Sequence, residues 1–212
     1  MAGIPLRARK KQLQQDALLD AAAELFRSRG FDAARIEDIA ALAGVSAKTV
    51  YNYFPGKDEL IVGLLVRDRQ GLAEDYERVL RRLPAEPAAG IAALVRADVG
   101  DVRSVQDKRL WREILAAETR GHERSRDDFG RNRKVFTGYI GRLLRHYIRA
   151  GALPAALPVA VASEIVYAIN AFDFREYCAS PTMTPAGVER RALRQARMLL
   201  AGWADPRPRG QG

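Results

Sequence analysis

The chain has 212 residues, of which 48% are hydrophobic and 29% charged, as in globular proteins long enough to bury a core. The net charge of +9 makes an anionic partner expected, nucleic acid first. A single cysteine, Cys178, excludes an intrachain disulfide and a cysteine metal cluster.

The first eleven residues carry four basic side chains, Arg7, Arg9, Lys10 and Lys11. They are expected to form a flexible arm that either contacts DNA beside the main site or is a solvated tail. Apolar residues at helical spacing then predict an amphipathic helix over 12–29. Its core side chains and those that follow are expected to be Leu18, Phe26, Phe31, Ile39 and Val50.

Residues 36–54 carry the pattern of two short helices joined by a tight turn. Gly44 ends the first helix because glycine readily adopts the left-handed conformation of a C-terminal cap. Ser46 is a suitable N-cap for a second helix over 47–54. This helix-turn-helix pattern predicts that the second helix enters a DNA major groove and presents its N-terminal residues to base edges.

The second helix divides into an inner and an outer face. Val50 and Phe54 are four residues apart and are expected to pack inward. The outer faces then carry side chains suited to base edges: Ala47, Lys48, Tyr51 and Asn52. Lys57 opens another helix, where its ammonium could hold a phosphate. A plain helical hairpin inside an all-α domain is the alternative.

The ordered set of residue types extends well beyond one motif. It comprises Gly30-Phe31, Ile36-Glu37-Asp38-Ile39-Ala40, Ala43-Gly44-Val45-Ser46, Thr49-Val50-Tyr51-Asn52-Tyr53-Phe54 and Lys57-Asp58-Glu59-Leu60. Together these residues resemble the N-terminal domain of the TetR-type transcriptional regulators, over about residues 13–65. Beyond that range the chain is similar to the family only in architecture.

The resemblance implies a division of labour among the DNA-contacting residues. It assigns base edges to Ala47, Lys48, Tyr51 and Asn52, and phosphates to Arg35, Thr49, Tyr53 and Lys57. The family usually has a hydroxyl residue before the first motif helix, where this chain has Ala34 and Arg35. The helix cap is therefore either weaker or supplied by Asp32, and the phosphate contact passes to Arg35.

The remainder of the chain is predicted to be helical throughout. A long helix over 57–83 ends before Pro84 and Pro87, and it would carry movement between domains as a lever. Further helices are expected near 88–102, 108–119, 124–150, 158–178 and 185–204. The resemblance implies an all-α fold with a basic flexible arm (1–11), a helix-turn-helix DNA-binding domain (12–56), a helical effector-binding and dimerisation domain (57–204) and a flexible tail (205–212).

The last two predicted helices resemble the pair through which TetR-type proteins dimerise. The interface residues expected are Val161, Ile165, Ile169, Ala192, Ala196 and Leu199. A two-fold dimer would also double the contact with DNA and match a palindrome. An intrachain core is the alternative for these helices.

The middle helices are expected to enclose a small-molecule effector. The residues proposed to line this pocket are Trp111, Leu115, Phe136, Tyr139, Tyr167, Asn170 and Phe174, although an aromatic stripe is also typical of ordinary core. The basic run 120–134 would either meet an anionic effector or form a solvated helix face.

Signatures of an enzyme are missing from the sequence. The two histidines, His122 and His146, have no metal-binding spacing, and no nucleophile elbow or phosphate-binding glycine loop occurs. We therefore predict no catalytic residues, no metal and no cofactor. The most apolar stretch, 153–172, contains two prolines and a glutamate and is predicted to be a buried helix in a cytoplasmic protein.

The predicted function is a ligand-responsive homodimeric repressor that a small-molecule effector releases from a palindromic operator in double-stranded DNA. The alternative is an all-α small-molecule-binding protein or enzyme with a vestigial helix-turn-helix. The two differ in whether DNA binding depends on Lys48 and Tyr51.

Overall fold

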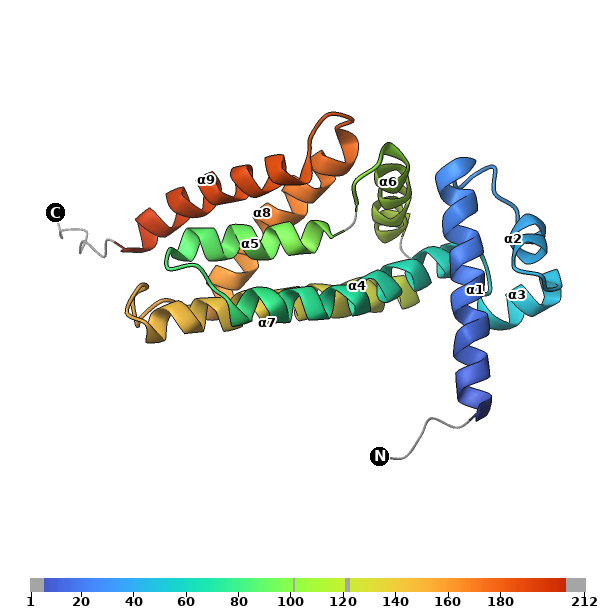
Figure 1. The fold of residues 1–212 in the computed structure, drawn as a ribbon, viewed down its shortest axis with the longest axis horizontal. Coiled ribbons are helices and arrows are strands. Elements are labelled where there is room, and N and C mark those ends of the chain that lie inside the picture. The colour runs from blue at the N-terminus through green and yellow to red at the C-terminus, as the bar shows by residue number, and fades with distance from the viewer. Residues whose placement is uncertain (1–5, 101, 121–122, 205–212) are drawn as a thin grey trace. The chain divides into compact units, whose positions relative to one another are not determined.

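The computed structural model describes residues 6–100, 102–120 and 123–204, without the side chains of 119, 120, 123–129, 132 and 204. Over these ranges the chain forms nine α-helices and no strand, which confirms the all-α prediction (Figure 1). The helices are α1 (Leu6–Ser28), α2 (Ile36–Leu42), α3 (Ala47–Tyr53), α4 (Lys57–Arg81), α5 (Pro87–Val99), α6 (Val105–Arg120), α7 (Glu123–Arg149), α8 (Val159–Ala179) and α9 (Pro185–Ala204). Within the same ranges no helix combines the length and apolar composition needed to cross a bilayer.

The chain divides into two compact units, the first with residues up to 68 and 104–128, the second with 69–103 and the residues from 129 onward. The predicted domain boundary after residue 56 lies earlier than this division. Leu60, Ile61 and Leu65 of α4 are fully buried and continue the core of the first unit. The helix α6 also belongs to the first unit, since it packs on α1.

The core of the first unit is built from the residues expected there. Leu18, Phe26, Ile39 and Val50 are completely buried. Phe31 is half-buried and packs against Phe26, with 5.3 Å between the ring centroids. Burial of these apolar side chains fixes the angle at which α2 and α3 lie on α1.

The start of α1 differs from the sequence prediction. Residues 6–11, assigned to a flexible arm, are helical and exposed, so that part of the prediction is wrong. Residues 6–29 contain no glycine or proline, and Arg, Lys, Gln, Leu and Ala favour a helix, so the helix extends toward the N-terminus. Residues 1–5 and the predicted tail 205–212 lie outside the described residues.

The turn between α2 and α3 is capped from both sides. Gly44 has φ 68° and donates to the carbonyl of Ala41 at 3.2 Å, while the amide of Val45 donates to Ala40 at 2.9 Å. This pair of bonds is the Schellman motif. On the other side, the hydroxyl of Ser46 accepts from the amide of Thr49 at 3.2 Å. The two predicted caps are thereby confirmed.

The contact between α6 and α1 depends on charged side chains at one end of α1. Arg109 donates to the carbonyl of Arg29 at 3.3 Å, and Arg27 pairs with Asp107 at 3.1 Å. The guanidinium of Arg109 lies over Gly30, where a Cβ atom would approach it to 2.3 Å. Gly30, with φ 89°, therefore ends α1 and also leaves room for α6.

The second unit is organised around α5, which packs extensively on α9. Its interior contains a polar group: the carboxylate of Asp98 accepts from Arg69, from the hydroxyl of Tyr76 and, at 2.8 Å, from Nδ2 of Asn170. Burial, followed by the negative charge of Asp98, raises the pKa of Tyr76 far above its usual value of 10.0. This network joins α4, α5 and α8 inside the unit.

Candidate nucleic-acid interface and neighbouring sites

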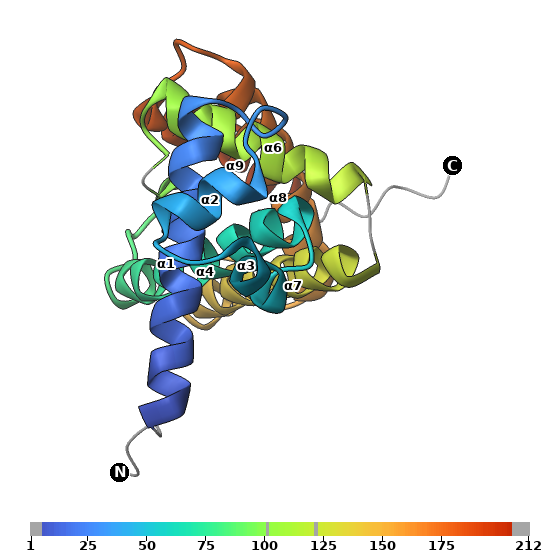
Figure 2. The same cartoon turned by 90° about the vertical axis from the view of Figure 1, so that its right-hand side faces the viewer.

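The helix α3 presents one buried and one free face (Figure 2). Val50 and the following Phe54 are buried as predicted. Lys48 and Asn52 are exposed, Tyr51 is 50% exposed and Ala47 is half-buried. The structure therefore brings the four predicted base-contacting side chains to accessible faces of one short helix.

Three of the predicted phosphate-contacting residues also hold the unit together. The Thr49 hydroxyl lies 2.9 Å from Ser46 Oγ, and the Tyr53 hydroxyl donates to Gln14 Oε1 at 3.1 Å. The Lys57 ammonium donates to the carbonyl oxygen of Phe31 at 2.7 Å. Each of these residues is half-buried, so its polar end is held in a defined position at the surface.

The ammonium of Lys57 has more than one partner. It also donates to the carbonyl of Asp32 at 3.2 Å and lies 4.6 Å from the centroid of the Phe31 ring. Sequence reasoning gave Lys57 a role toward phosphate alone. It missed that the same ammonium fastens α4 to the loop between α1 and α2, because a contact across 26 residues leaves no local pattern.

Arg35 occupies the N-cap position of α2, and its side chain makes no capping hydrogen bond. It is largely exposed and its Nε lies 3.5 Å from a carboxylate oxygen of Glu37. A surface pair of this kind is weak. The guanidinium can therefore turn toward a phosphate at little cost in free energy.

The seven residues predicted to line one effector pocket are not all brought together. Trp111 and Leu115 lie on α6 in the first unit, and the others belong to the second. There, Phe136 contacts the rings of Tyr76 and Tyr167, with centroids 5.4 and 6.4 Å apart. These aromatic side chains fill the space that was expected to be hollow.

Phe136 and Phe174 are buried as core residues, while Tyr139 and Tyr167 are half-buried. The cavity present in the second unit lies instead between α5, α8 and α9, and of the predicted residues only Asn170 lines it. Most of the basic run 120–134 lies outside the residues whose side chains are described.

The predicted dimer residues point in two directions. Val161 and Ile165 are exposed on α8. Ala192 and Ala196 are only 6% and 4% exposed in the single chain, which corrects their assignment to an outer surface. They line the cavity against α5, together with the half-buried Ile169 and Leu199.

An apolar residue missed at the sequence level extends the exposed face of α8. Phe172 is exposed and follows Val161 by eleven residues, about three helical turns, so it shares the face of Val161 and Ile165. That spacing is visible in the sequence and could have identified Phe172. The helix α8 thus carries an exposed apolar stripe consisting of Val161, Ile165 and Phe172.

Residues 18–64 match the family model described as bacterial regulatory proteins, tetR family. The chain is 28% identical over 130 residues to the HTH-type transcriptional regulator RutR of Escherichia coli O157:H7, covering 49% of this chain and 61% of RutR. It is 32% identical over 151 residues to the HTH-type transcriptional regulator SrpR of Pseudomonas putida, covering 66% of this chain and 63% of SrpR. The chain therefore spans less than two thirds of either relative.

The fold also matches known structures over nearly its whole length. The transcriptional regulator FadR of Bacillus subtilis, solved in complex with stearoyl-CoA, superimposes with a TM-score of 0.66 at 18% identity. The match covers 85% of this chain and 96% of FadR. At this identity the comparison establishes the fold.

Proposed function

We propose that this chain, a member of the tetR family of bacterial regulatory proteins by its residues 18–64, binds a palindromic DNA operator as a homodimer and regulates transcription. The observation that carries the proposal is the free face of α3, where Lys48, Tyr51 and Asn52 stand exposed beside a fully buried Val50. In a helix-turn-helix this face meets base edges in the major groove. The curated relatives are named transcriptional regulators, which supports a regulator over an enzyme.

The side chains on α3 suit different parts of the readout. The amide of Asn52 has the geometry to bond adenine at two atoms, and the ammonium of Lys48 can reach guanine. Thr49, Tyr53, Lys57 and Arg35 would hold the phosphates on either side. The exposed basic turns at the start of α1, residues 6–11, add positive charge that DNA would attract.

A dimer would join two copies through the apolar stripe of α8. An exposed stripe of this kind is typical of an interface between subunits. One recognition helix reads few base pairs, whereas two related by a two-fold axis read a palindrome with fixed half-site spacing. The substitution Ile165→Glu would place a charge in this interface and is expected to yield monomers in sedimentation equilibrium. Val135→Glu, at an exposed valine of α7, is the matched control.

The direct test is selection of genomic DNA fragments by the purified protein at near-physiological salt. Enrichment of a palindrome supports the proposal, while diffuse, salt-sensitive recovery would contradict it. On the selected operator, Asn52→Ala is expected to relax preference at one base position at a cost of ~1–3 kcal/mol. Gln70→Ala, which removes an exposed amide from α4, is the control and should leave every position unchanged.

Repression relieved by a small molecule is the mode of regulation that we propose. An effector can release DNA only if it binds the released conformation more tightly than the DNA-bound one. The stearoyl-CoA in the FadR structure supports ligand binding by this fold. A compound that lowers operator affinity in a titration, and whose own affinity falls when operator is present, would meet both requirements.

A further inference from the structure

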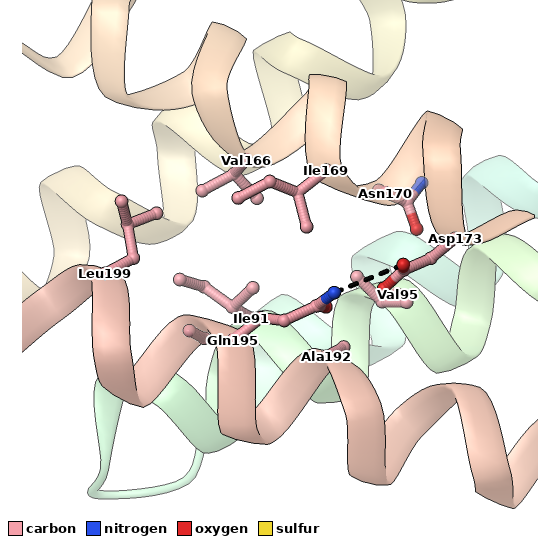
Figure 3. Close-up of a pocket in the computed structure, with 10 residues that line it drawn as sticks. Ile91, Val95, Val166, Ile169, Asn170, Asp173, Ala192, Gln195 and Leu199 are labelled. Carbon is pink, nitrogen blue, oxygen red and sulfur yellow. Dashed lines mark hydrogen bonds between the residues drawn. The ribbon is translucent and has the colours of Figure 1, made fainter.

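The second unit contains a cavity between α5, α8 and α9 that neither the predicted pocket nor the α8 stripe accounts for (Figure 3). It encloses about 300 Å³ of space, part of it open to solvent. One part of its lining is aliphatic and the other is polar. The lining residues are Ile91, Val95, Val166, Ile169, Asn170, Asp173, Ala192, Gln195, Ala196 and Leu199.

The polar end contains two acceptor atoms with no donor. Asp173 is 1% exposed, and its Oδ1 accepts from Gln195 Nε2 at 3.2 Å and pairs with Arg191 Nε at 3.0 Å. Its Oδ2 and the Oε1 of Gln195 are both buried and have no hydrogen-bond partner among the described residues. Buried acceptors normally have partners, so this pair indicates a place for a donor.

The charges at this end restrict what the donor can be. An anion would meet the carboxylate of Asp173 and the amide oxygen of Gln195, both of which repel it. A cation would compete with Arg191, whose guanidinium already balances the carboxylate. A neutral hydroxyl satisfies an acceptor without adding charge, and burying it then costs little free energy.

The aliphatic end sets the size of the molecule. Ile91, Val166, Ile169 and Leu199 gather around the side of the cavity away from Asp173 (Figure 3). A dry cavity of ~150 Å³ lined by such side chains holds benzene. The space here is therefore sufficient for one ring or a short alkyl chain that carries a hydroxyl.

We propose that this cavity binds a small neutral alcohol or phenol, with its apolar body between Ile91 and Leu199 and its hydroxyl donating to Asp173 Oδ2 or Gln195 Oε1. Binding follows from the cavity alone, whereas its use as the effector site rests on the proposed function. The bound molecule would touch α5, α8 and α9 at once. It would thereby favour one packing of α8, the helix whose exposed stripe we assign to the dimer.

The test uses four probes of nearly the same shape: benzyl alcohol, toluene, benzoate and benzylamine. Binding to the full chain without DNA is followed by methyl signals of isoleucine, leucine and valine in two-dimensional NMR spectra. Benzyl alcohol is expected to shift the signals of Ile91, Val166, Ile169 and Leu199 to saturation, while Ile114 of the first unit stays fixed. Toluene should bind about fivefold more weakly because it has no donor, and the two ions should not saturate.

Two variants locate the site. Ala196→Leu fills the cavity and should abolish saturable binding, whereas Ala201→Leu on an exposed position of α9 should not. Gln195→Met removes one acceptor at nearly constant length and should lower the affinity for benzyl alcohol toward that for toluene. Circular dichroism and the unshifted methyl signals verify that each variant folds, and Gln195→Met supplies the test if Ala196→Leu does not fold.

Three results would overturn the proposal: no saturable shift with benzyl alcohol, equal binding of benzoate, or unchanged binding by both Ala196→Leu and Gln195→Met. Because these measurements contain no DNA, their failure leaves the operator selection unaffected. Conversely, a protein that selects no palindrome can still bind benzyl alcohol here.

Discussion

The carboxylate of Asp98 is the position in the second unit where a single substitution should have the largest effect on stability. Asp98 is 5% exposed and accepts from three side chains, one charged and two neutral: Arg69, Tyr76 and Asn170. The side chain of Arg69 is only 15% exposed. In Asp98→Ala the three donors stay buried and lose their common acceptor.

The magnitude follows from what remains after the substitution. Removing one member of a buried ion pair costs about 3–5 kcal/mol, since the other charge is left in the interior. Each orphaned neutral donor adds ~1–3 kcal/mol, less whatever relief water entering the space provides. We expect Asp98→Ala to lower the free energy of unfolding by about 4 kcal/mol, which is a large part of the stability of a typical domain.

Urea unfolding at pH 7 and fixed protein concentration, followed by circular dichroism, measures this loss. Asp75→Ala is the matched control, because Asp75 pairs with Arg78 on the surface of α4 and should change stability by less than ~1 kcal/mol. The double variant Arg69→Met/Asp98→Leu removes both charges and should recover much of the loss. If Asp98→Ala costs less than ~1 kcal/mol, the network does not hold α4, α5 and α8 together as inferred.

Three further predictions concern local features. Gly44→Ala meets no atom within 4 Å but must adopt φ 68°, so it should cost ~1 kcal/mol in urea unfolding, and an unchanged midpoint would contradict the cap. Lys57→Met removes a charged donor to two carbonyls and should lower the stability of the first unit by ~1.5 kcal/mol even without DNA; a loss of DNA affinity alone would refute this structural role. The pKa of Glu86 is held below 4.5 by a hydrogen bond from Arg197, so its contribution to stability is present above pH 4.5 and disappears as the pH falls through the lowered pKa. Glu86→Gln should therefore unfold earlier than the parent at pH 7 but not at the acid end of a pH series, and a constant difference would exclude this pair as the cause.

Local chemistry explains why so much of the DNA-contacting unit is readable from the chain. The αL conformation at Gly44, the cap at Ser46 and the inward positions Val50 and Phe54 each depend on residues within one or two helical turns. The same applies to the helix boundaries, which glycine, proline and capping residues set. An outer face follows once the inner one is known, so the exposure of Lys48 and Asn52 was also predictable.

The second unit was less predictable because many of its residues have apolar neighbours on several sides. Ala192 and Ala196 are small and apolar, which suits both a dimer interface and an intrachain contact. Only the packing of α9 on α5 decides for the latter. The aromatic residues Phe136 and Tyr167 fit a pocket wall equally well as a filled core, and their mutual contact decides for the core.

The sequence by itself therefore determined the helices, their caps and the face of α3 offered to DNA, because short-range hydrogen bonds and helical periodicity govern them. Tertiary structure alone decided which helices join which unit, as with α6 on α1, and which distant polar groups meet. The partners of Asp98 come from three helices, and Asp173 meets its partners across the space between α8 and α9. Such contacts arise from the packing of whole helices, and no spacing along the chain encodes them.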